Sequence, residues 1–413
     1  MNLKRVAIIA LFILAVVLGG LVLYRIFFRP LLTIQPPAPG AENTVNGGGL
    51  QPSVNGRPVT VPTNVNARPT TPPPVTPTRP AVSPTAQGGV TAVTQLETAP
   101  TVGATLAADG TLRFYNKDDG KFYRLNADGT MSTISNKTFF NVSAATFNPQ
   151  GSGVILEYPD RTKFFYDFNA NRQYTIPQHW EQFRFSPGGD KIETKSMTLD
   201  AENRYLVISN PDGSGAKAIQ ELGNNADKVA LAWSPNNQIV ATAATGTNQG
   251  LGRTEVYFVG QNNENFKSMM VEGIDFRPQW SPTGNNMLYS VTGPLTDWRP
   301  TLWVVDASGQ NVGSGRRMLN LNTWADKCSF AGGTTLYCAV PQTLERGAGL
   351  QPDVADTTPD DIYRVDLTTG TQTKIATPEG DHTVDKLMPS SDGQYLFFTD
   401  RGSGLINKIK LAP

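Results

Sequence analysis

The stretch Trp280-Ser-Pro-Thr-Gly284 is one copy of a short phrase that occurs seven times along the chain. In each copy an apolar or aromatic residue precedes a turn rich in Pro, Asp, Asn or Gly, and a short apolar strand follows. Proline presets the turn, and Gly or Asn adopts the positive φ that other residues avoid. The other copies begin at Leu106, Phe147, Phe185, Trp233, Phe330 and Met388. A supersecondary unit repeated at intervals of a few tens of residues predicts a β-propeller.

The repeats cover about 315 residues, so seven units of roughly 45 residues match the usual length of a four-stranded blade. The last unit contains only three strand-like segments before the chain ends. Because an unpaired blade edge is unfavourable, we expect the strand-like segment Gly89–Glu97 to supply the missing outer strand. We therefore predict an all-β propeller of seven four-stranded blades over residues 89–413, with six blades as the alternative.

Three copies of the phrase, at Phe185–Asp190, Trp233–Asn236 and Trp280–Gly284, resemble the aromatic-Ser-Pro-Asp-Gly signature of TolB-like propellers, a WD-repeat-like group. The resemblance implies a propeller fold and protein binding through one mouth of the central channel. Two features differ from that group. TolB itself has an α/β domain ahead of its propeller and no membrane anchor, and TolB-type propellers commonly have six blades.

An apolar segment lies near the N-terminus. Val6–Tyr24 contains nineteen uncharged, mostly apolar residues between Arg5 and Arg25. As a helix it would extend roughly 28 Å, which is close to the hydrocarbon thickness of a bilayer. A cleaved signal peptide, the alternative, usually has a shorter apolar stretch and a small-residue cleavage site. We predict a transmembrane anchor within residues 1–30.

Residues 31–88 are rich in Pro, Thr, Gly and Asn and contain few charges. Such a segment buries too little apolar surface to offset the entropy lost on ordering, so we predict a disordered linker. The linker would hold the propeller away from the membrane; binding of proline-recognising modules is the alternative. We predict a single-pass protein of the cell membrane with a cytoplasmic N-terminus and an extracytoplasmic propeller, partly because of the cysteine pair described below.

The composition of the 413-residue chain argues against several kinds of chemistry. The 35 basic and 35 acidic residues balance, so no nucleic-acid partner is indicated. Two His and two Cys are too few for a His-rich metal centre or a multi-cysteine zinc site. No Gly-x-Ser-x-Gly elbow or Gly-Lys-Ser/Thr phosphate loop is present. We expect no cofactor, no metal and no catalytic residue.

Two weaker alternatives remain open at this stage. His179 and His382 precede first strands and are interpreted as loop residues, with acid–base chemistry as the alternative. Four carboxylates in or beside an insertion of the sixth blade are interpreted as a solvated acidic loop, with calcium binding as the alternative, because EF-hand spacing is absent. These carboxylates are Asp353, Asp356, Asp360 and Asp361.

Charged and aromatic residues recur in the loops that lead into the first strands. Because first strands line the axis of a propeller, these loops should surround one mouth of the channel. Aromatic anchors give affinity and charges give orientation, so we predict a partner-binding surface with exposed lysines. The alternative is a set of exposed ion pairs, each worth at most about 1 kcal/mol, that hold blades in register. The candidate residues are His179, Trp180, Glu181, Arg184, Asp227, Lys228, Asp275, Phe276, Arg277, Trp324, Asp326, Lys327, His382, Asp385 and Lys386.

The two cysteines flank one turn of the sixth unit. If the turn centres on Gly333, Cys328 and Cys338 lie directly opposite each other on antiparallel strands. Opposed residues have Cα atoms about 4.5–5.5 Å apart, which is within reach of a disulfide. We predict a bridge, with two buried thiols as the alternative. A bridge requires an oxidising compartment and so supports an extracytoplasmic propeller.

These features lead to a functional hypothesis. We expect a membrane-tethered, extracytoplasmic β-propeller that binds a protein or peptide as a scaffold or sensor in a cell-envelope assembly. The alternative is a propeller enzyme or binding protein for glycans or wall polymers, which would use carboxylates at the same mouth.

Overall fold

The computed structural model describes Leu18 and residues 81–412, apart from positions 127, 128, 248, 249, 251 and 263. The predicted anchor and nearly all of the predicted linker lie outside these residues. No helix in the described part of the chain is long and apolar enough to cross a membrane. The chain divides into two units, Met1–Val75 and Thr76–Pro413, and the fold below belongs to the second.

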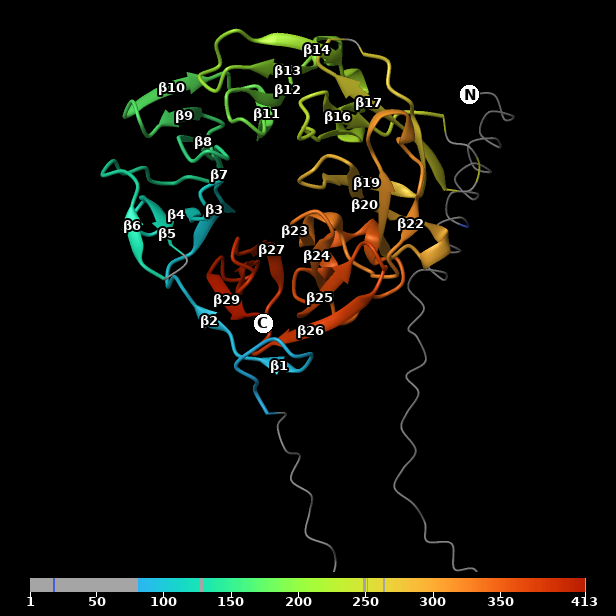
Figure 1. The fold of residues 1–413 in the computed structure, drawn as a ribbon. Helices are drawn as coiled ribbons and strands as arrows, with labels where there is room; N and C mark the ends of the chain where they lie inside the picture. Colours follow the sequence, from blue (N-terminus) through green and yellow to red (C-terminus); the bar gives the residue numbers. More distant parts are fainter. Residues whose placement is uncertain are drawn as a thin grey trace, which may run out of the picture. The chain divides into compact units, whose positions relative to one another are not determined.

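Seven small sheets form a ring around a central axis, which confirms the predicted seven-bladed, all-β propeller (Figure 1). The first strand of each blade lies nearest the axis and the last lies at the rim (Figure 1). Blades one to four consist of β3 (Thr101–Leu106), β4 (Leu112–Asn116), β5 (Phe122–Leu125), β6 (Met131–Thr133); β7 (Ala144–Phe147), β8 (Gly153–Glu157), β9 (Lys163–Asp167), β10 (Arg172–Ile176); β11 (Trp180–Phe185), β12 (Ile192–Ser196), β13 (Tyr205–Ser209), β14 (Lys217–Glu221); and β15 (Val229–Leu231), β16 (Ile239–Ala243), β17 (Arg253–Gly260), β18 (Met269–Glu272).

The remaining three blades follow the same order, and two short N-terminal strands join the last two of them. These strands are β19 (Ile274–Trp280), β20 (Asn286–Thr292), β21 (Pro300–Asp306), β22 (Arg317–Met318); β23 (Cys328–Ala331), β24 (Thr335–Pro341), β25 (Asp360–Asp366), β26 (Gln372–Pro378); β27 (Val384–Pro389), β28 (Tyr395–Asp400), β29 (Ile406–Lys410); and β1 (Val90–Thr91), β2 (Thr94–Gln95). Short 3₁₀ helices occur in the loops at η1 (Ala201–Asn203), η2 (Gly223–Lys228), η3 (Pro294–Thr296), η4 (Gly309–Asn311), η5 (Ala325–Lys327), η6 (Ala348–Leu350) and η7 (Pro352–Ala355).

The serine of the repeated phrase closes its turn. In four blades the serine hydroxyl accepts a hydrogen bond from the backbone N–H five residues later, where the second strand begins. The donors and acceptors are Lys191 and Ser186, Ile239 and Ser234, Asn286 and Ser281, and Tyr395 and Ser390. Because this bond is local, the turn recurs wherever the sequence Ser-Pro or Pro-Ser recurs in the phrase.

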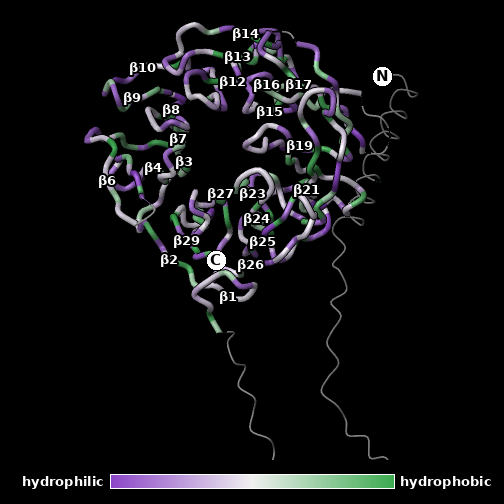
Figure 2. Tube along the Cα trace, viewed as in Figure 1, coloured by the Kyte–Doolittle hydropathy of each residue, from purple (hydrophilic) through white to green (hydrophobic). Residues whose placement is uncertain are grey.

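The aromatic residue of the phrase packs one blade against the preceding one. The Trp280 ring lies 6.4 Å from the Phe258 ring of blade four, and its indole N–H donates a 2.8 Å hydrogen bond to the carbonyl oxygen of Ala232. A separate hydrophobic cluster fills each of the seven interfaces between neighbouring blades. The core is therefore a ring of interfaces, and hydrophobic and hydrophilic residues intermingle along the blades (Figure 2).

The N-terminal strands close the ring. β2 pairs antiparallel with β29, which confirms that the segment after Gly89 supplies the outer strand of blade seven. β1 pairs parallel with β26 of blade six, a contact that the sequence analysis did not predict. Farther upstream, Ala86 forms a bridge with Leu411, so the start of the propeller lies beside the end of the chain (Figure 1). One segment thus fastens the last two blades.

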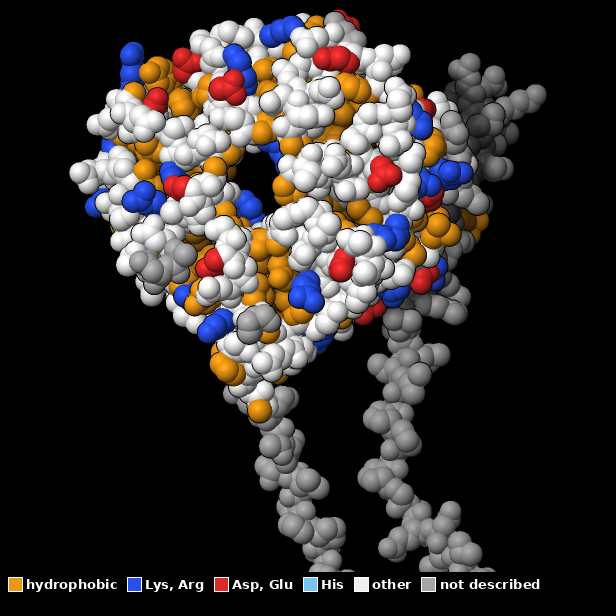
Figure 3. Space-filling model, in the orientation of Figure 1, with side chains coloured by type: hydrophobic (Ala, Val, Ile, Leu, Met, Phe, Trp, Pro, Cys, Tyr) orange, Lys and Arg blue, Asp and Glu red, His pale blue; other side chains and the backbone are white. Residues whose placement is uncertain are grey.

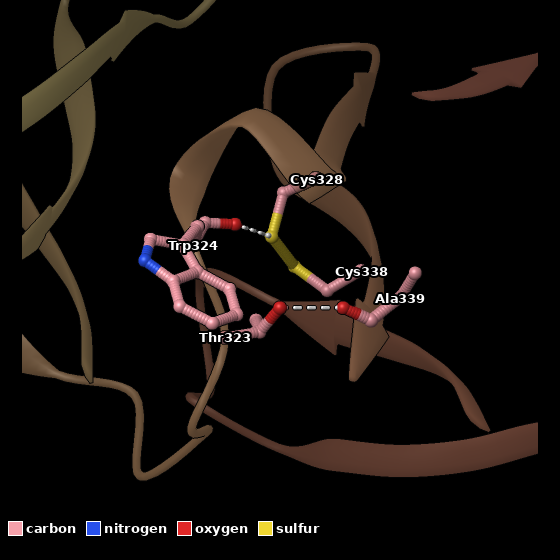
Figure 4. The surroundings of a disulfide bond; sticks show 5 residues. All are labelled: Thr323, Trp324, Cys328, Cys338 and Ala339. Carbon is pink, nitrogen blue, oxygen red and sulfur yellow. Dashed lines mark hydrogen bonds between the residues drawn. A yellow bond between two sulfur atoms is a disulfide. The ribbon is translucent and has the colours of Figure 1, made fainter. Parts of the chain in front are cut away.

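The cysteines occupy the predicted register. Cys328 on β23 pairs directly with Cys338 on β24, and their sulfur atoms form a disulfide (Figure 4). Next to the bridge, the hydroxyl of Thr323 donates a 2.6 Å hydrogen bond to the carbonyl oxygen of Ala339. Both cysteines are buried in the cluster between blades five and six, so the bridge fixes the inner strands of blade six within the core.

Candidate functional site

β-Bulges shape one end of the inner strands. In blades one, three, five and seven the pairing of the first strand with the second shifts by one or more residues near the start of the first strand. In three of these blades a residue there has a positive φ: Gly103 (69°), Gln182 (57°) and Asp275 (56°). A bulge re-aims the side chains around it. The bulges lie where the loops enter the inner strands, at the mouth predicted from the sequence.

The structure separates the candidate residues by exposure. The three half-buried candidates are Phe276, Arg277 and His382, and the three buried ones are Trp180, Trp324 and Lys327. The nine exposed candidates are His179, Glu181, Arg184, Asp227, Lys228, Asp275, Asp326, Asp385 and Lys386. Most of the predicted set therefore faces solvent or the channel.

The burial of Lys327 corrects the prediction that the lysines are exposed, and two tryptophans of the set are buried as well. Trp180 belongs to the cluster between blades two and three. Trp324 is only 3% exposed, and its ring lies beneath the guanidinium of Arg277. Lys327, only 8% exposed, donates hydrogen bonds of 2.9 and 2.7 Å to the two carboxylate oxygens of Asp360. A buried charge requires such a partner. These side chains stabilise the blades and do not reach a partner.

Asp360 in turn connects two blades. Its carboxylate accepts a 2.7 Å hydrogen bond from the backbone N–H of Val384 in blade seven. Burial raises the pKa of Asp360, while the ammonium of Lys327 and these hydrogen bonds oppose that rise. Two other carboxylates of the acidic loop pair with cations of the chain: Asp361 lies 2.7 Å from Lys374, and Asp356 lies 2.6 Å from Arg401. The fourth, Asp353, is exposed.

Two arginines form ion-pair bridges across the mouth at blades five to seven. The guanidinium of Arg277 lies 3.0 Å from Asp275 and 3.0 Å from Asp326 of the next blade, and above the Trp324 ring. Arg401 contacts Asp385 at 3.0 Å in addition to Asp356. At these positions the structure matches the alternative interpretation, in which charges join neighbouring blades. The sequence analysis missed Arg401, because it lies in a loop between the second and third strands rather than before a first strand.

An open cleft lies at the same mouth between blades four and five. It has a volume of about 420 Å³, and small residues form part of its lining, among them Gly246 and Gly273. Asp227 and Lys228 line it from blade four, and Asp275 and Phe276 from blade five. Four predicted residues thus share one cavity. Beyond Arg277 a much smaller pocket, about 60 Å³, continues toward blades six and seven.

Ile274 adds an apolar element to this cleft that the sequence analysis did not single out. Its side chain is 45% exposed, although it is a large aliphatic residue. It lies between Gly273, with a φ of 144°, and the bulge at Asp275. Large exposed apolar side chains grouped with charges mark interaction surfaces. An aliphatic residue between a glycine and an Asp at the start of a first strand is the signal that sequence inspection could have used.

The two histidines lie in different blades. The Nδ1 atom of His382 lies 3.1 Å from a carboxylate oxygen of Asp400, and its ring packs on Phe398. Burial by itself would raise the pKa of Asp400, but hydrogen bonds from His382 and Ser403 lower it to about 2. Within the described residues, no three His, Cys, Asp or Glu side chains are grouped so that they could hold a metal ion.

The fold and the arrangement of its mouth define the chain as a seven-bladed β-propeller. No protein-family model matches the sequence, and no curated protein is similar to it. A solved oligogalacturonate lyase in complex with manganese has a TM-score of 0.53 and 13% identity, and the match covers 78% of this chain and 93% of that one. The propeller domain of Cps50 (Swd1) from Myceliophteria thermophila has a TM-score of 0.51 and 9% identity, covering 78% of this chain and all of that domain. At such identities the likeness shows the fold alone.

Proposed function

We propose that this protein is a membrane-tethered, extracytoplasmic binding module whose propeller holds an extended segment of a protein partner in a cell-envelope assembly, as a scaffold or sensor. The observation that carries the proposal is the cleft between blades four and five. Its lining combines small residues, an exposed aliphatic side chain and charges of both signs. Peptide recognition uses these elements: apolar pockets give affinity and charged rims set orientation.

The pairing of the neighbouring carboxylates favours binding over glycoside chemistry. Glycosidases need two carboxyl groups that flank the bond to be cleaved. Asp275 and Asp326 instead share the guanidinium of Arg277, and Asp385 contacts Arg401. These ion pairs already occupy the three carboxylates, so none of the three is free to act on a glycosidic bond.

The cleft can be tested with one substitution and a matched control. Ile274→Asp places a charge in the cleft, and Leu199→Asp places the same charge on a loop of blade three, where Leu199 is 97% exposed. The full-length protein, solubilised from membranes, is presented to a pool of short random peptides. We expect the wild type and Leu199→Asp to select the same peptides and Ile274→Asp to lose them. Equal selection by all three proteins would refute binding in this cleft.

The proposed membrane tether rests on the sequence. The proposed extracytoplasmic location of the propeller is supported by the disulfide, since disulfides persist in oxidising compartments. A membrane-impermeant probe that labels an introduced cysteine at Leu199 in intact cells, but not one introduced at Asn2, would support the proposed orientation. Labelling at neither position would place the propeller inside the cell and contradict the extracytoplasmic part of the proposal. Both cysteines are introduced in the Cys328→Ala, Cys338→Ala background so that the native thiols do not react.

A further inference from the structure

Charged residues on the seven inner strands follow a pattern around the channel. The inner strands of blades one, two, four and six contain no Asp, Glu, Lys or Arg, and all residues of these strands are described. The inner strands of blades three, five and seven each contain one acidic residue followed by one basic residue. Since these strands run from the mouth into the channel, the acidic residues lie at the edge of the mouth and the basic residues lie deeper in the channel. The pairs are Glu181 with Arg184, Asp275 with Arg277, and Asp385 with Lys386.

Two of the three deeper cations have no carboxylate partner among the described residues. Arg277 is held by Asp275 and Asp326. Arg184 is exposed and makes no hydrogen bond or ion pair within the described chain. Within the part of the chain that the structure describes, the ammonium of Lys386 donates a hydrogen bond only to the carbonyl oxygen of Ala104 in blade one, at 3.1 Å. Figure 3 shows basic side chains on the wall of the central opening. Unpaired cations there leave a positive potential along the axis.

Arg184 and Lys386 come from blades three and seven, which are far apart around the ring. Lys386 is surrounded by protein, yet its side chain remains accessible, as expected for a residue on the wall of a channel. Burial lowers the pKa of Lys386, and the positive charge of Arg184 lowers it further, against the opposing effect of Asp385. Both residues lie on inner strands, which line the axis of a propeller, and both side chains are exposed.

Glu193 does not neutralise Arg184, although it lies opposite Arg184 in the pairing of β11 with β12. Its side chain is fully buried, and its carboxyl oxygens make no hydrogen bond of normal geometry with the described residues. Burial raises the pKa of Glu193 well above its ordinary value, and the charge of Arg184 opposes that rise only in part. Because no ion pair joins the buried Glu193 to Arg184, the guanidinium remains free to bind an anion.

We propose that Arg184 and Lys386 form an anion site on the channel axis that receives the C-terminal carboxylate of the bound peptide. This inference rests on the proposed function, because the peptide reaches the channel through the same mouth. The planar guanidinium binds a carboxylate through two parallel hydrogen bonds, and the ammonium supplies a third donor. A chain end can enter an axial channel directly, whereas an internal acidic side chain would require the chain to turn back on itself.

The acidic rim adds selectivity to this arrangement. A polyanion would meet Glu181 and Asp385 before it reached the cations, and like charges in close contact disfavour binding. A peptide whose only negative charge is its C-terminal carboxylate avoids that repulsion, and its carboxylate can reach the cations deeper in the channel. The rim thus favours a single terminal carboxylate over an anionic polymer.

The test uses one pool of short random peptides prepared in two forms, with a free carboxyl terminus and with a terminal amide. Full-length protein should retain free-acid peptides and bind their amides about tenfold to a hundredfold more weakly, as expected for loss of charge-assisted hydrogen bonds. Arg184→Gln and Lys386→Met should each remove this preference. Lys386→Arg should restore it, and Lys410→Met, which removes an exposed cation on the last strand, should leave it intact.

The outcomes separate this inference from the proposed function. Equal retention of acids and amides by the wild type would overturn the carboxylate site and leave peptide binding in place. Peptide amides whose last residue is Asp or Glu could also be retained as strongly as the free acids. That result would show that the site binds an acidic side chain, and it would overturn the proposal that the site binds the C-terminal carboxylate. Failure to retain any peptide in either form would overturn both proposals. Thermal melting of each variant verifies that a lost preference does not reflect unfolding.

Discussion

The loops before blades four and six carry the same sequence element and place it in opposite environments. Asp227-Lys228 ends the 3₁₀ helix η2, and Asp326-Lys327 ends the 3₁₀ helix η5. Lys228 is exposed beside the open cleft, and among the described residues its ammonium donates a hydrogen bond only to Asn225, at 3.2 Å. Lys327 is buried against Asp360. An identical doublet on the same local structure therefore serves two different purposes.

The difference arises from a neighbouring connection rather than from the doublets. In blade six, the connection from Pro341 to Asp360 contains η6 and η7, and Pro352 and Ala355 line the small pocket beside Lys327. In blade four the corresponding connection, from Ala243 to Arg253, is shorter. The longer connection covers the mouth at blades six and seven, and the shorter one leaves the cleft between blades four and five open. Loop length decides which doublet is exposed.

Removing the two lysines provides the strongest test of this comparison. Lys327→Met leaves Asp360 buried without its cation, so we expect a loss of about 3–5 kcal/mol in the free energy of unfolding. Lys228→Met, the matched control, should change it by less than about 0.5 kcal/mol because the side chain is exposed. Denaturant unfolding of the two variants measures both values. Equal effects would show that the doublets do not differ as described.

The loss in Lys327→Met should depend on pH with a defined sign. Burial raises the pKa of Asp360 in the folded protein, and removing Lys327 takes away the main opposing effect. The folded variant then binds a proton more tightly than the unfolded chain, so its stability should fall as the pH rises through the range between the two pKa values. Asp360→Asn in the same background should remove this pH dependence. A loss that grew on acidification would contradict the assignment.

The disulfide of blade six should contribute the next largest effect. Cys328→Ala with Cys338→Ala opens a short loop, for which the chain-entropy model gives about 2–3 kcal/mol. The expected result is a lower free energy of unfolding with an unchanged preference among peptides, because the bridge lies in the core between blades five and six. Mass spectrometry after alkylation of the denatured, non-reduced wild type should find no free thiol. Alkylation of both cysteines would show that the bridge is absent.

The sequence predicted those parts of the fold that local interactions determine. The register of Cys328 with Cys338 follows from counting residues on either side of one turn, and each turn is closed by bonds within its own phrase. The outer strand of blade seven was also predictable, because an unpaired edge must be covered. The parallel pairing of β1 with β26 was not, since nothing in a two-residue strand specifies which blade it joins.

The candidate site was predictable in outline only. Counting positions before each first strand found residues on both sides of the cleft, among them Lys228 and Phe276. It did not distinguish Lys327 from Lys228, because Asp360, the partner of Lys327, lies far along the chain. Arg401 was missed for the same reason. Burial and pairing at a propeller mouth depend on connections that come from other strands, and a local pattern contains no information about them.

A smaller, pH-dependent effect is expected in blade seven, on the covered side of the mouth. The pKa of Asp400 is lowered to about 2 in the folded protein, so its ionised form stabilises the fold above its ordinary pKa, and this contribution is lost as the pH falls toward 2. Asp400→Asn should therefore cost about 1–2 kcal/mol at neutral pH, allowing for solvent screening. The difference from the wild type should narrow between about pH 4 and pH 2. A difference that stayed constant over that range would rule out a titrating role for this carboxylate.

The smallest effect distinguishes a bridge between blades from a binding residue. Arg277 is half-buried and joins Asp275 to Asp326 across blades five and six. Arg277→Gln should lower the free energy of unfolding by only about 1 kcal/mol, because the released carboxylates are largely exposed and become hydrated. If the bridge only aligns blades, the double variant Asp326→Asn, Arg277→Gln should be no less stable than Arg277→Gln, since the two residues act as one pair. If the peptide affinity fell tenfold in Arg277→Gln but not in Asp326→Asn, Arg277 would belong to the binding surface of the open cleft. The boundary between the covered and the open side of the mouth would then lie at Lys327 and not at Arg277.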